Sequence, residues 1–264
     1  MNTYLSSFER LVNIMDELRE KCPWDKKQTL ESLRHLTIEE TYELSEAILD
    51  GDMKKIRNEL GDLLLHIVFY SRIAKEQNAF TLGEMIDGLS EKLIKRHPHI
   101  YGDVIADTAE EVKHNWEKIK LAEKDKEGNA VNKTVLEGVP QSLPAMIKSW
   151  RIQEKARGAG FDWEKPEQVL DKVKEELGEL QKEISEGQNN LRIEQEFGDL
   201  LFALINYARF IDVNPEDALE KTNRKFISRF SYMEEKVRTT GKHLSDLTLE
   251  QMDVYWEEAK GRGL

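Results

Sequence analysis

The feature that most constrains this chain is an acidic pattern that occurs twice, in the same order and at nearly the same spacing. In the first half, Glu39-Glu40-Thr41-Tyr42-Glu43 precedes Glu59-Leu60-Gly61-Asp62. In the second half, Glu175-Glu176-Leu177-Gly178-Glu179 precedes Glu196-Phe197-Gly198-Asp199. The matched motifs are 136 and 137 positions apart. Ordered pairs at a nearly constant offset predict the duplication of one structural module.

The hydrophobic spacing around these motifs is helical. Apolar residues recur at the i, i+3, i+4 and i+7 positions in both halves: Leu60, Leu63, Leu64 and Ile67, and then Phe197, Leu200, Leu201 and Leu204. No convincing alternation of apolar and polar residues predicts a strand, so the sequence favours an all-α fold. Turn signals at residues 50–52, 186–190 and 214–215 separate the expected helices.

The segment between the two halves differs from both of them. It is polar, lacks helical periodicity and contains two Gly and two Pro. We therefore expect an N-terminal helical module at 1–123, a linker at 124–144 and a C-terminal helical module at 145–264.

The acidic residues of each half are spaced to share helix faces. Residues at i and i+3 project from one side of a helix, one turn apart. A turn joins the two helices of each half, so we expect them to pack antiparallel, with their carboxylates converging at the edge of the seam. The first cluster is Glu40, Glu43, Glu59 and Asp62, and the second is Glu176, Glu179, Glu196 and Asp199.

Four clustered carboxylates require compensation by protons or by cations. Two unit charges about 4 Å apart repel by roughly 4 kcal/mol at an effective dielectric near 20. Carboxylate oxygens are hard ligands that select Mg²⁺, Mn²⁺ or Ca²⁺. Because Mg²⁺ is usually shared between a few carboxylates and substrate phosphates, the clusters predict a Mg²⁺ site for a phosphorylated substrate. A redox di-iron centre is the rival, but it uses Glu-x-x-His motifs, which neither cluster contains.

Basic and aromatic residues accompany the acidic pattern of each half in matching order. Lys and Arg at i and i+4 can reach one anion, and an indole at that spacing from a Lys can stack on a base. Lys55 and Arg192 each lie four residues before the second acidic motif of their half. The matched pairs are Lys225 with Arg229 and Trp256 with Lys260 in the second half, and Lys92 with Arg96 and Trp116 with Lys120 in the first.

The charge and the cysteine content exclude several classes of protein. A net charge of −12 argues against a general nucleic-acid binder, because such proteins neutralise phosphates with Lys and Arg. A single cysteine, Cys22, excludes an intrachain disulfide framework and fits a reducing cytoplasm. The charged residues Glu9 and Arg10 precede any apolar run, so we expect no signal peptide. No apolar run is long enough to span a bilayer. We expect a cytoplasmic protein with no membrane or nucleic-acid partner.

Four motifs together resemble the MazG nucleoside triphosphate pyrophosphohydrolases. They are Cys22-Pro23-Trp24-Asp25, Thr37-Ile38-Glu39-Glu40-Thr41-Tyr42-Glu43, Glu59-Leu60-Gly61-Asp62-Leu63-Leu64 and Lys95-Arg96-His97-Pro98-His99-Ile100-Tyr101-Gly102. The resemblance covers essentially the whole chain, including the tandem arrangement. It implies an all-α, Mg²⁺-dependent and usually dimeric enzyme, with four-helix-bundle-like carboxylate sites completed by dimerisation.

The resemblance also implies roles for individual residues. The metal ligands are Glu176, Glu179, Glu196 and Asp199, with Glu40, Glu43, Glu59 and Asp62 as their equivalents. The nucleotide contacts are Lys172, Glu175, Glu176, Arg192, Asp199, Lys225, Arg229, Trp256 and Lys260, with Lys55, Lys92, Arg96, Trp116 and Lys120 as candidates in the first half. Glu175 is the candidate that positions or deprotonates the attacking water. Lys172 lies one turn before Glu176, whereas Leu36 occupies the matching position before Glu40, so the first half lacks one charge on the phosphate side.

The sequence and the resemblance together predict hydrolysis of nucleoside triphosphates to nucleoside monophosphate and pyrophosphate. We expect Mg²⁺, for which Mn²⁺ can substitute, to activate a water that attacks the α-phosphorus. Two alternatives stay open: a regulatory module that binds Mg-nucleotide without turnover, and a narrower pyrophosphohydrolase for dUTP or altered nucleotides. The sequence does not determine the preferred base or whether both halves are catalytic.

Overall fold

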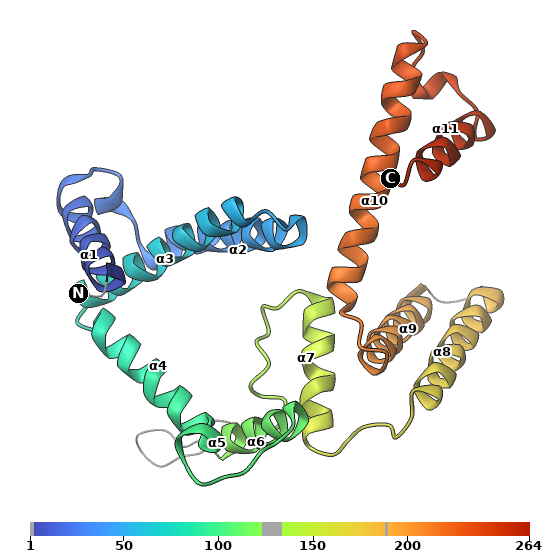
Figure 1. The fold of residues 1–264 in the computed structure, drawn as a ribbon. Helices are drawn as coiled ribbons and strands as arrows, with labels where there is room; N and C mark the ends of the chain where they lie inside the picture. The colour runs from blue at the N-terminus through green and yellow to red at the C-terminus, as the bar shows by residue number, and fades with distance from the viewer. Residues whose placement is uncertain (1–2, 123–133, 188–189) are drawn as a thin grey trace. The chain divides into compact units, whose positions relative to one another are not determined.

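The computed structural model describes residues 3–122, 134–187 and 190–264 (Figure 1). Every regular element within these residues is a helix, which confirms the predicted all-α fold. The chain forms two compact units, residues 1–112 and 113–264. Residues 123–133, which include the first part of the expected linker, lie outside the described part of the chain, and α7 begins at Ala145, where the second module is expected to start.

The helices follow one another in a similar order in the two units. In the first unit they are α1 (Thr3–Lys21), the short 3₁₀ helix η1 (Asp25–Lys27), α2 (Leu30–Asp50), α3 (Met53–Glu76), α4 (Leu82–Arg96) and α5 (Pro98–Tyr101). The helix α6 (Ala109–Leu121) begins before the division between the units and ends after it. The second unit continues with α7 (Ala145–Gly158), α8 (Pro166–Glu186), α9 (Asn190–Phe210), α10 (Pro215–Thr239), η2 (Leu244–Asp246) and α11 (Leu249–Gly261).

Each acidic pattern lies on a helical hairpin, α2 with α3 and α8 with α9 (Figure 1). Gly51 ends α2 with a φ of 67°, a left-handed conformation that glycine adopts without steric cost. Asp52 then caps α3, because its side chain accepts hydrogen bonds from the amides of Lys54 and Lys55. Gly187 ends α8 in the same way, with a φ of 65°. These caps lie within the predicted turns at residues 50–52 and 186–190, and the helices on either side of each turn pack on each other.

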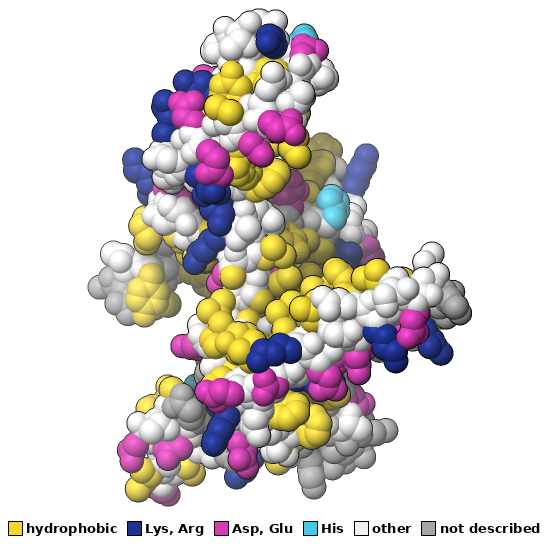
Figure 2. All heavy atoms as spheres, turned by 90° about the vertical axis from the view of Figure 1, so that its right-hand side faces the viewer, with side chains coloured by type: hydrophobic (Ala, Val, Ile, Leu, Met, Phe, Trp, Pro, Cys, Tyr) yellow, Lys and Arg dark blue, Asp and Glu magenta, His cyan; other side chains and the backbone are white. Residues whose placement is uncertain are grey.

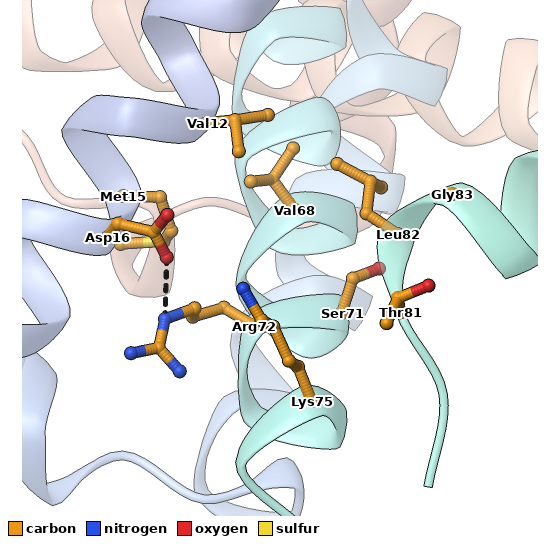
Figure 3. A pocket seen from close by; sticks show the side chains of 10 residues that line it. All are labelled: Val12, Met15, Asp16, Val68, Ser71, Arg72, Lys75, Thr81, Leu82 and Gly83. Carbon is orange, nitrogen blue, oxygen red and sulfur yellow. Dashed lines mark ion pairs between the residues drawn. The ribbon is translucent and has the colours of Figure 1, made fainter. Parts of the chain in front are cut away.

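The core of the first unit forms where α1, α2 and α3 meet. Its buried members are Met15, Leu33, Val68, Phe69 and Ile73. At its edge, α1, α3 and the start of α4 surround a cavity of about 230 Å³, crossed by an ion pair in which Arg72 Nε lies 2.6 Å from Asp16 Oδ1 (Figure 3). The ion pair therefore holds α3 against α1 beside the hydrophobic core.

In the second unit, α9 packs on both α8 and α7, while α10 packs on α11 and α7. The Gln153 side chain on α7 donates a 2.8 Å hydrogen bond to the carbonyl of Phe202 on α9. Arg209, at the end of α9, pairs with Asp162 in the loop before α8. The helix α7 therefore braces the acidic hairpin, and the Arg209 contact fixes its far end.

Both acidic hairpins leave many apolar side chains exposed. Figure 2 shows hydrophobic side chains, in yellow, gathered over a broad part of the visible surface. On α8 and α9 the exposed apolar residues are Leu177, Ile184, Leu191, Phe197, Leu201, Phe202 and Leu204, and on α2 and α3 they are Ile38, Tyr42, Ile48, Met53, Leu60, Leu64 and Ile67. No helix among the described residues is apolar enough over a sufficient length to cross a membrane.

Candidate metal and nucleotide site

The hairpin of α8 and α9 brings three of its four predicted carboxylates into one group. Ligand oxygens of Glu176, Glu196 and Asp199 all lie within 4.8 Å of one another. Glu176 is buried, with 7 % of its surface exposed, whereas Asp199 is exposed. Glu179, one turn after Glu176, is outside this group but close enough to repel Glu196. The predicted cluster is therefore assembled around a buried carboxylate.

The hairpin of α2 and α3 forms the corresponding group in the first unit. Here the oxygens of Glu40, Glu43 and Glu59 lie within 4.8 Å of one another. Asp62 is outside this group, although its charge acts on both Glu40 and Glu59. The two triads are not equivalent by position, because the first includes Glu43 and the second includes the counterpart of Asp62.

Three carboxyls in these clusters have raised pKa values. Desolvation, followed by repulsion from Glu179 and Asp199, raises the pKa of Glu196 above its ordinary value. Desolvation and the neighbouring carboxylates likewise raise the pKa values of Glu40 and Glu59. Both clusters therefore hold negative charge at a cost that a cation would relieve.

The donor set fits a hard divalent cation. Each triad offers oxygen ligands alone, and the close approach of three carboxylate oxygens allows one ion to contact all of them. Among the described residues, no histidine or cysteine joins either triad. His66, one turn after Asp62, is buried, and burial lowers its pKa. Both acidic clusters can therefore hold a metal ion of the kind that binds carboxylates and phosphates.

Lys172 lies within the second cluster. Its Nζ atom is 2.7 Å from Glu176 Oε1 and 2.9 Å from Glu175 Oε1. The bonds to Glu176 and then Glu175 raise the pKa of Lys172, so the ammonium stays charged. Glu175, the candidate for positioning water, is thus tied to Lys172. In the first unit, Leu36 instead packs against the hydrophobic core.

The remaining predicted contacts of the second half gather on α10 and α11. The guanidinium of Arg229 lies 5.8 Å from the Trp256 ring centroid, and its Nε donates a 2.7 Å hydrogen bond to the carbonyl of Leu264. Lys260 pairs with Glu257 at 2.7 Å, and Lys225 is exposed on α10. Helices α10 and α11, which carry these residues, pack mainly on each other. The principal helix contacts within the chain therefore do not connect these basic residues to the carboxylates of α8 and α9.

Two other predicted cations lie at the turn end of their hairpins. Arg192 Nη1 is 3.8 Å from Glu183 Oε1, and Lys55 Nζ is 3.6 Å from Asp50 Oδ2. The structure therefore places both near the acidic helices, each with a carboxylate partner of its own.

The first-half candidates after the hairpin are divided between the units. Lys92 and Arg96 lie on α4 in the first unit. Trp116 and Lys120 lie on α6 in the second, where the neighbouring Glu117 pairs with Arg151 of α7 at 2.9 Å. The order of motifs along the chain therefore does not by itself define one binding site in the first half.

The sequence reasoning missed a repeated arginine. Arg72 and Arg209 are 137 positions apart, the same offset as the second acidic motif. Each ties the end of its acidic hairpin to a preceding segment, Arg72 through Asp16 and Arg209 through Asp162. The constant offset was a signal that could have identified both.

Glycine costs roughly 1 kcal/mol relative to alanine in a helix interior, so its repeated use at Gly61 and Gly198 predicts the close approach of another backbone or of a ligand. A Cβ added at Gly61 or Gly198 would meet nothing within 4 Å in the described chain. Packing within one chain therefore does not require glycine at these two positions.

The sequence matches the MazG nucleotide pyrophosphohydrolase domain twice, over residues 28–101 and 164–233, which contain the two acidic hairpins. The chain is 46 % identical over 256 residues to the nucleoside triphosphate pyrophosphohydrolase/pyrophosphatase MazG of Thermotoga maritima, covering 96 % of each protein. It is 38 % identical over 260 residues to the nucleoside triphosphate pyrophosphohydrolase of Escherichia coli K12, covering 97 % of this chain and 98 % of that protein. An uncharacterized Bacillus subtilis protein, YabN, is 45 % identical over 255 residues, which are 96 % of this chain and 51 % of YabN. These matches confirm both the resemblance and the duplication, and the chain belongs to the MazG nucleotide pyrophosphohydrolase family.

Proposed function

We propose that this protein hydrolyses nucleoside triphosphates to nucleoside monophosphate and pyrophosphate, with Mg²⁺ as the cofactor and Mn²⁺ as a substitute. The observation that carries the proposal is the convergence of Glu176, Glu196 and Asp199 beside the ammonium of Lys172. Relatives that align with nearly the whole chain are named as nucleoside triphosphate pyrophosphohydrolases. A site with hard oxygen ligands and an adjacent cation suits a substrate that carries several phosphates.

In the proposed reaction, a water oxygen bonds to the α-phosphorus while the bond from that phosphorus to the bridging oxygen breaks. Pyrophosphate leaves with that oxygen, and the water proton passes to a base, for which Glu175 is the candidate. Glu176, Glu179, Glu196 and Asp199 would hold Mg²⁺, which when bound would offset phosphate charge and acidify the attacking water.

The basic side chains of the second half contact the phosphates in this proposal. Lys172, Arg192, Lys225 and Arg229 neutralise the charge that develops on the departing pyrophosphate. Trp256 offers an aromatic face on which the nucleobase can stack, and Lys260 provides a further contact to phosphate. Glu40, Glu43, Glu59 and Asp62 form the equivalent metal site of the first half, which lacks the counterpart of Lys172.

The functional assembly in this proposal is a homodimer. Two observations support it: the apolar side chains of the α8/α9 hairpin are exposed, and the principal packing partners of α10 are α11 and α7 rather than the helices that carry the carboxylates. A second copy would bury the apolar face as in a four-helix bundle and would bring further helices to the carboxylates.

Product analysis in H₂¹⁸O tests the proposed bond cleavage. We expect pyrophosphate and nucleoside monophosphate as products, with the label on the monophosphate. Nucleoside diphosphate and labelled inorganic phosphate would contradict attack at the α-phosphorus. A panel of ribonucleoside, deoxyribonucleoside and altered triphosphates in the same assay separates a broad enzyme from a narrow one. Nucleotide binding without any product would favour the regulatory module instead.

A further inference from the structure

The α8/α9 cluster contains an internal cation that the α2/α3 cluster lacks. Lys172 Nζ lies 2.7 Å from Glu176 Oε1, and only 9 % of the Glu176 side chain is exposed. The same carboxylate belongs to the triad whose oxygens lie within 4.8 Å of one another. The contact is therefore between an ammonium and a candidate metal ligand at the buried centre of the site.

A divalent cation and this ammonium would compete for one carboxylate. If a metal ion bound the triad, Lys172 would lie a few ångströms from two further positive charges, and this repulsion is weakly screened near a buried group. Lys172 is able to move, because 36 % of its side chain is exposed and its ammonium is carried on a flexible stem. Its second partner, Glu175, has 57 % of its side chain exposed.

We propose that Lys172 is a displaceable counter-ion, which neutralises Glu176 while the site lacks a metal and transfers to a substrate phosphate when a divalent cation binds. The inference rests on the proposed function, since it requires a metal and a phosphorylated substrate at this cluster. It assigns two alternating partners to one lysine. The ammonium thereby prevents a highly negative empty site and afterwards offsets the charge of the nucleotide.

The test measures the Mn²⁺ affinity in the absence of nucleotide, and the KM for Mg-nucleotide in a separate assay. The full-length chain carries Glu40→Gln and Glu59→Gln, so that Mn²⁺ titrated by calorimetry or electron paramagnetic resonance reports the second cluster. We expect Lys172→Met to bind Mn²⁺ about tenfold more tightly, because the competing charge is gone, and to raise the KM for Mg-nucleotide about tenfold. Lys172→Arg retains a competing cation and should bind Mn²⁺ nearly as the parent does.

The matched control is Lys174→Met. Lys174 lies on the same helix but pairs with Asp171 at 2.9 Å, and 66 % of its side chain is exposed. It should leave both the Mn²⁺ affinity and the KM unchanged. Unchanged or weaker Mn²⁺ binding by Lys172→Met would overturn the counter-ion role, and tighter binding with an unchanged KM would overturn the transfer to phosphate. Pyrophosphate release by the unmodified protein is measured independently, so failure of the proposed function is recognised by its absence.

Discussion

At the residue scale, the two halves differ in how they compensate their acidic charge. Glu176 is buried beside Lys172. In the first half Leu36 packs into the core instead, and desolvation, followed by the neighbouring carboxylates, raises the pKa of Glu40. Burying a charge is costly unless a partner offsets the lost hydration. Within the described part of the chain, only the second cluster therefore has a cation of its own that can meet the phosphates of a triphosphate.

This asymmetry predicts unequal effects of removing single carboxylates. We expect Glu179→Ala or Asp199→Ala to lower pyrophosphate release roughly a hundredfold, because losing one such transition-state contact costs on the order of 3 kcal/mol. Glu43→Ala or Asp62→Ala should lower it less. Equal losses in both halves would contradict the ranking. If turnover is unchanged in all four variants while circular dichroism shows intact folding, the clusters have a structural or regulatory role.

The raised pKa values of Glu40, Glu59 and Glu196 predict how stability depends on pH. Their folded-state values lie above the ordinary 4.5, so the folded protein binds protons more strongly than the unfolded chain. The stability they contribute is fully present below pH 4.5 and is lost as pH rises through the raised values. We expect a variant that combines Glu40→Gln, Glu59→Gln and Glu196→Gln to lose less thermal stability than the parent as the pH rises above 4.5, measured by calorimetry in EDTA. An identical pH dependence in the two proteins would show that these carboxyls are not coupled in solution.

At the element scale, the unit that repeats is the capped antiparallel hairpin. Positive φ values at Gly51 and Gly187 end the first helix of each hairpin at matching places. The acids at i and i+3 then face their counterparts across the seam. In the proposed site, both helices of a hairpin supply metal ligands. We therefore expect excess EDTA to abolish turnover and Mn²⁺ or Mg²⁺ to restore it. Full activity in EDTA would exclude this chemistry.

The open space around Gly198 permits a prediction about helix stability. Alanine is favoured over glycine in a helix interior by about 1 kcal/mol, and a Cβ at this position meets no atom of the described chain. We therefore expect Gly198→Ala, and likewise Gly61→Ala, to raise the unfolding midpoint by a few degrees in a denaturation assay. A lower midpoint would indicate that a second chain closely approaches the glycine.

At the scale of the whole molecule, the exposed apolar faces are the feature that one chain does not explain. Phe197 and Leu201 are 53 % and 44 % exposed on the same helix that carries Glu196 and Asp199. Large contiguous apolar surfaces are costly in water and mark interfaces. In the proposed dimer, the interface and the site are therefore linked, because the same hairpin supplies both.

A charge placed on the apolar face of the α8/α9 hairpin should destabilise the proposed dimer. We expect Leu201→Glu to shift the protein toward monomer in light scattering coupled to size exclusion, and to lower turnover at the same enzyme concentration. Leu249→Glu is the control, since Leu249 is 70 % exposed on α11, outside the hairpin. A monomeric parent protein with full activity would contradict the dimeric assembly.

The sequence by itself determined the local structure and its repetition. Hydrophobic period, turn residues and acidic spacing are properties of neighbouring positions, so they predicted the helices, the turns after Asp50 and Glu186, and which acids share a face. The constant offset of the motifs predicted the duplicated family module, which the domain matches confirm.

Only the tertiary structure decided which of these groups meet. It selected three acids of each four for close approach, joined Lys172 to Glu176, and divided Lys92 and Trp116 between different units. It also shows that a Cβ added at Gly198 would have no close neighbour in the described chain. The physical reason is that such distances depend on how helices pack and on which rotamers burial permits, and the spacing of residues along a single helix does not contain that information.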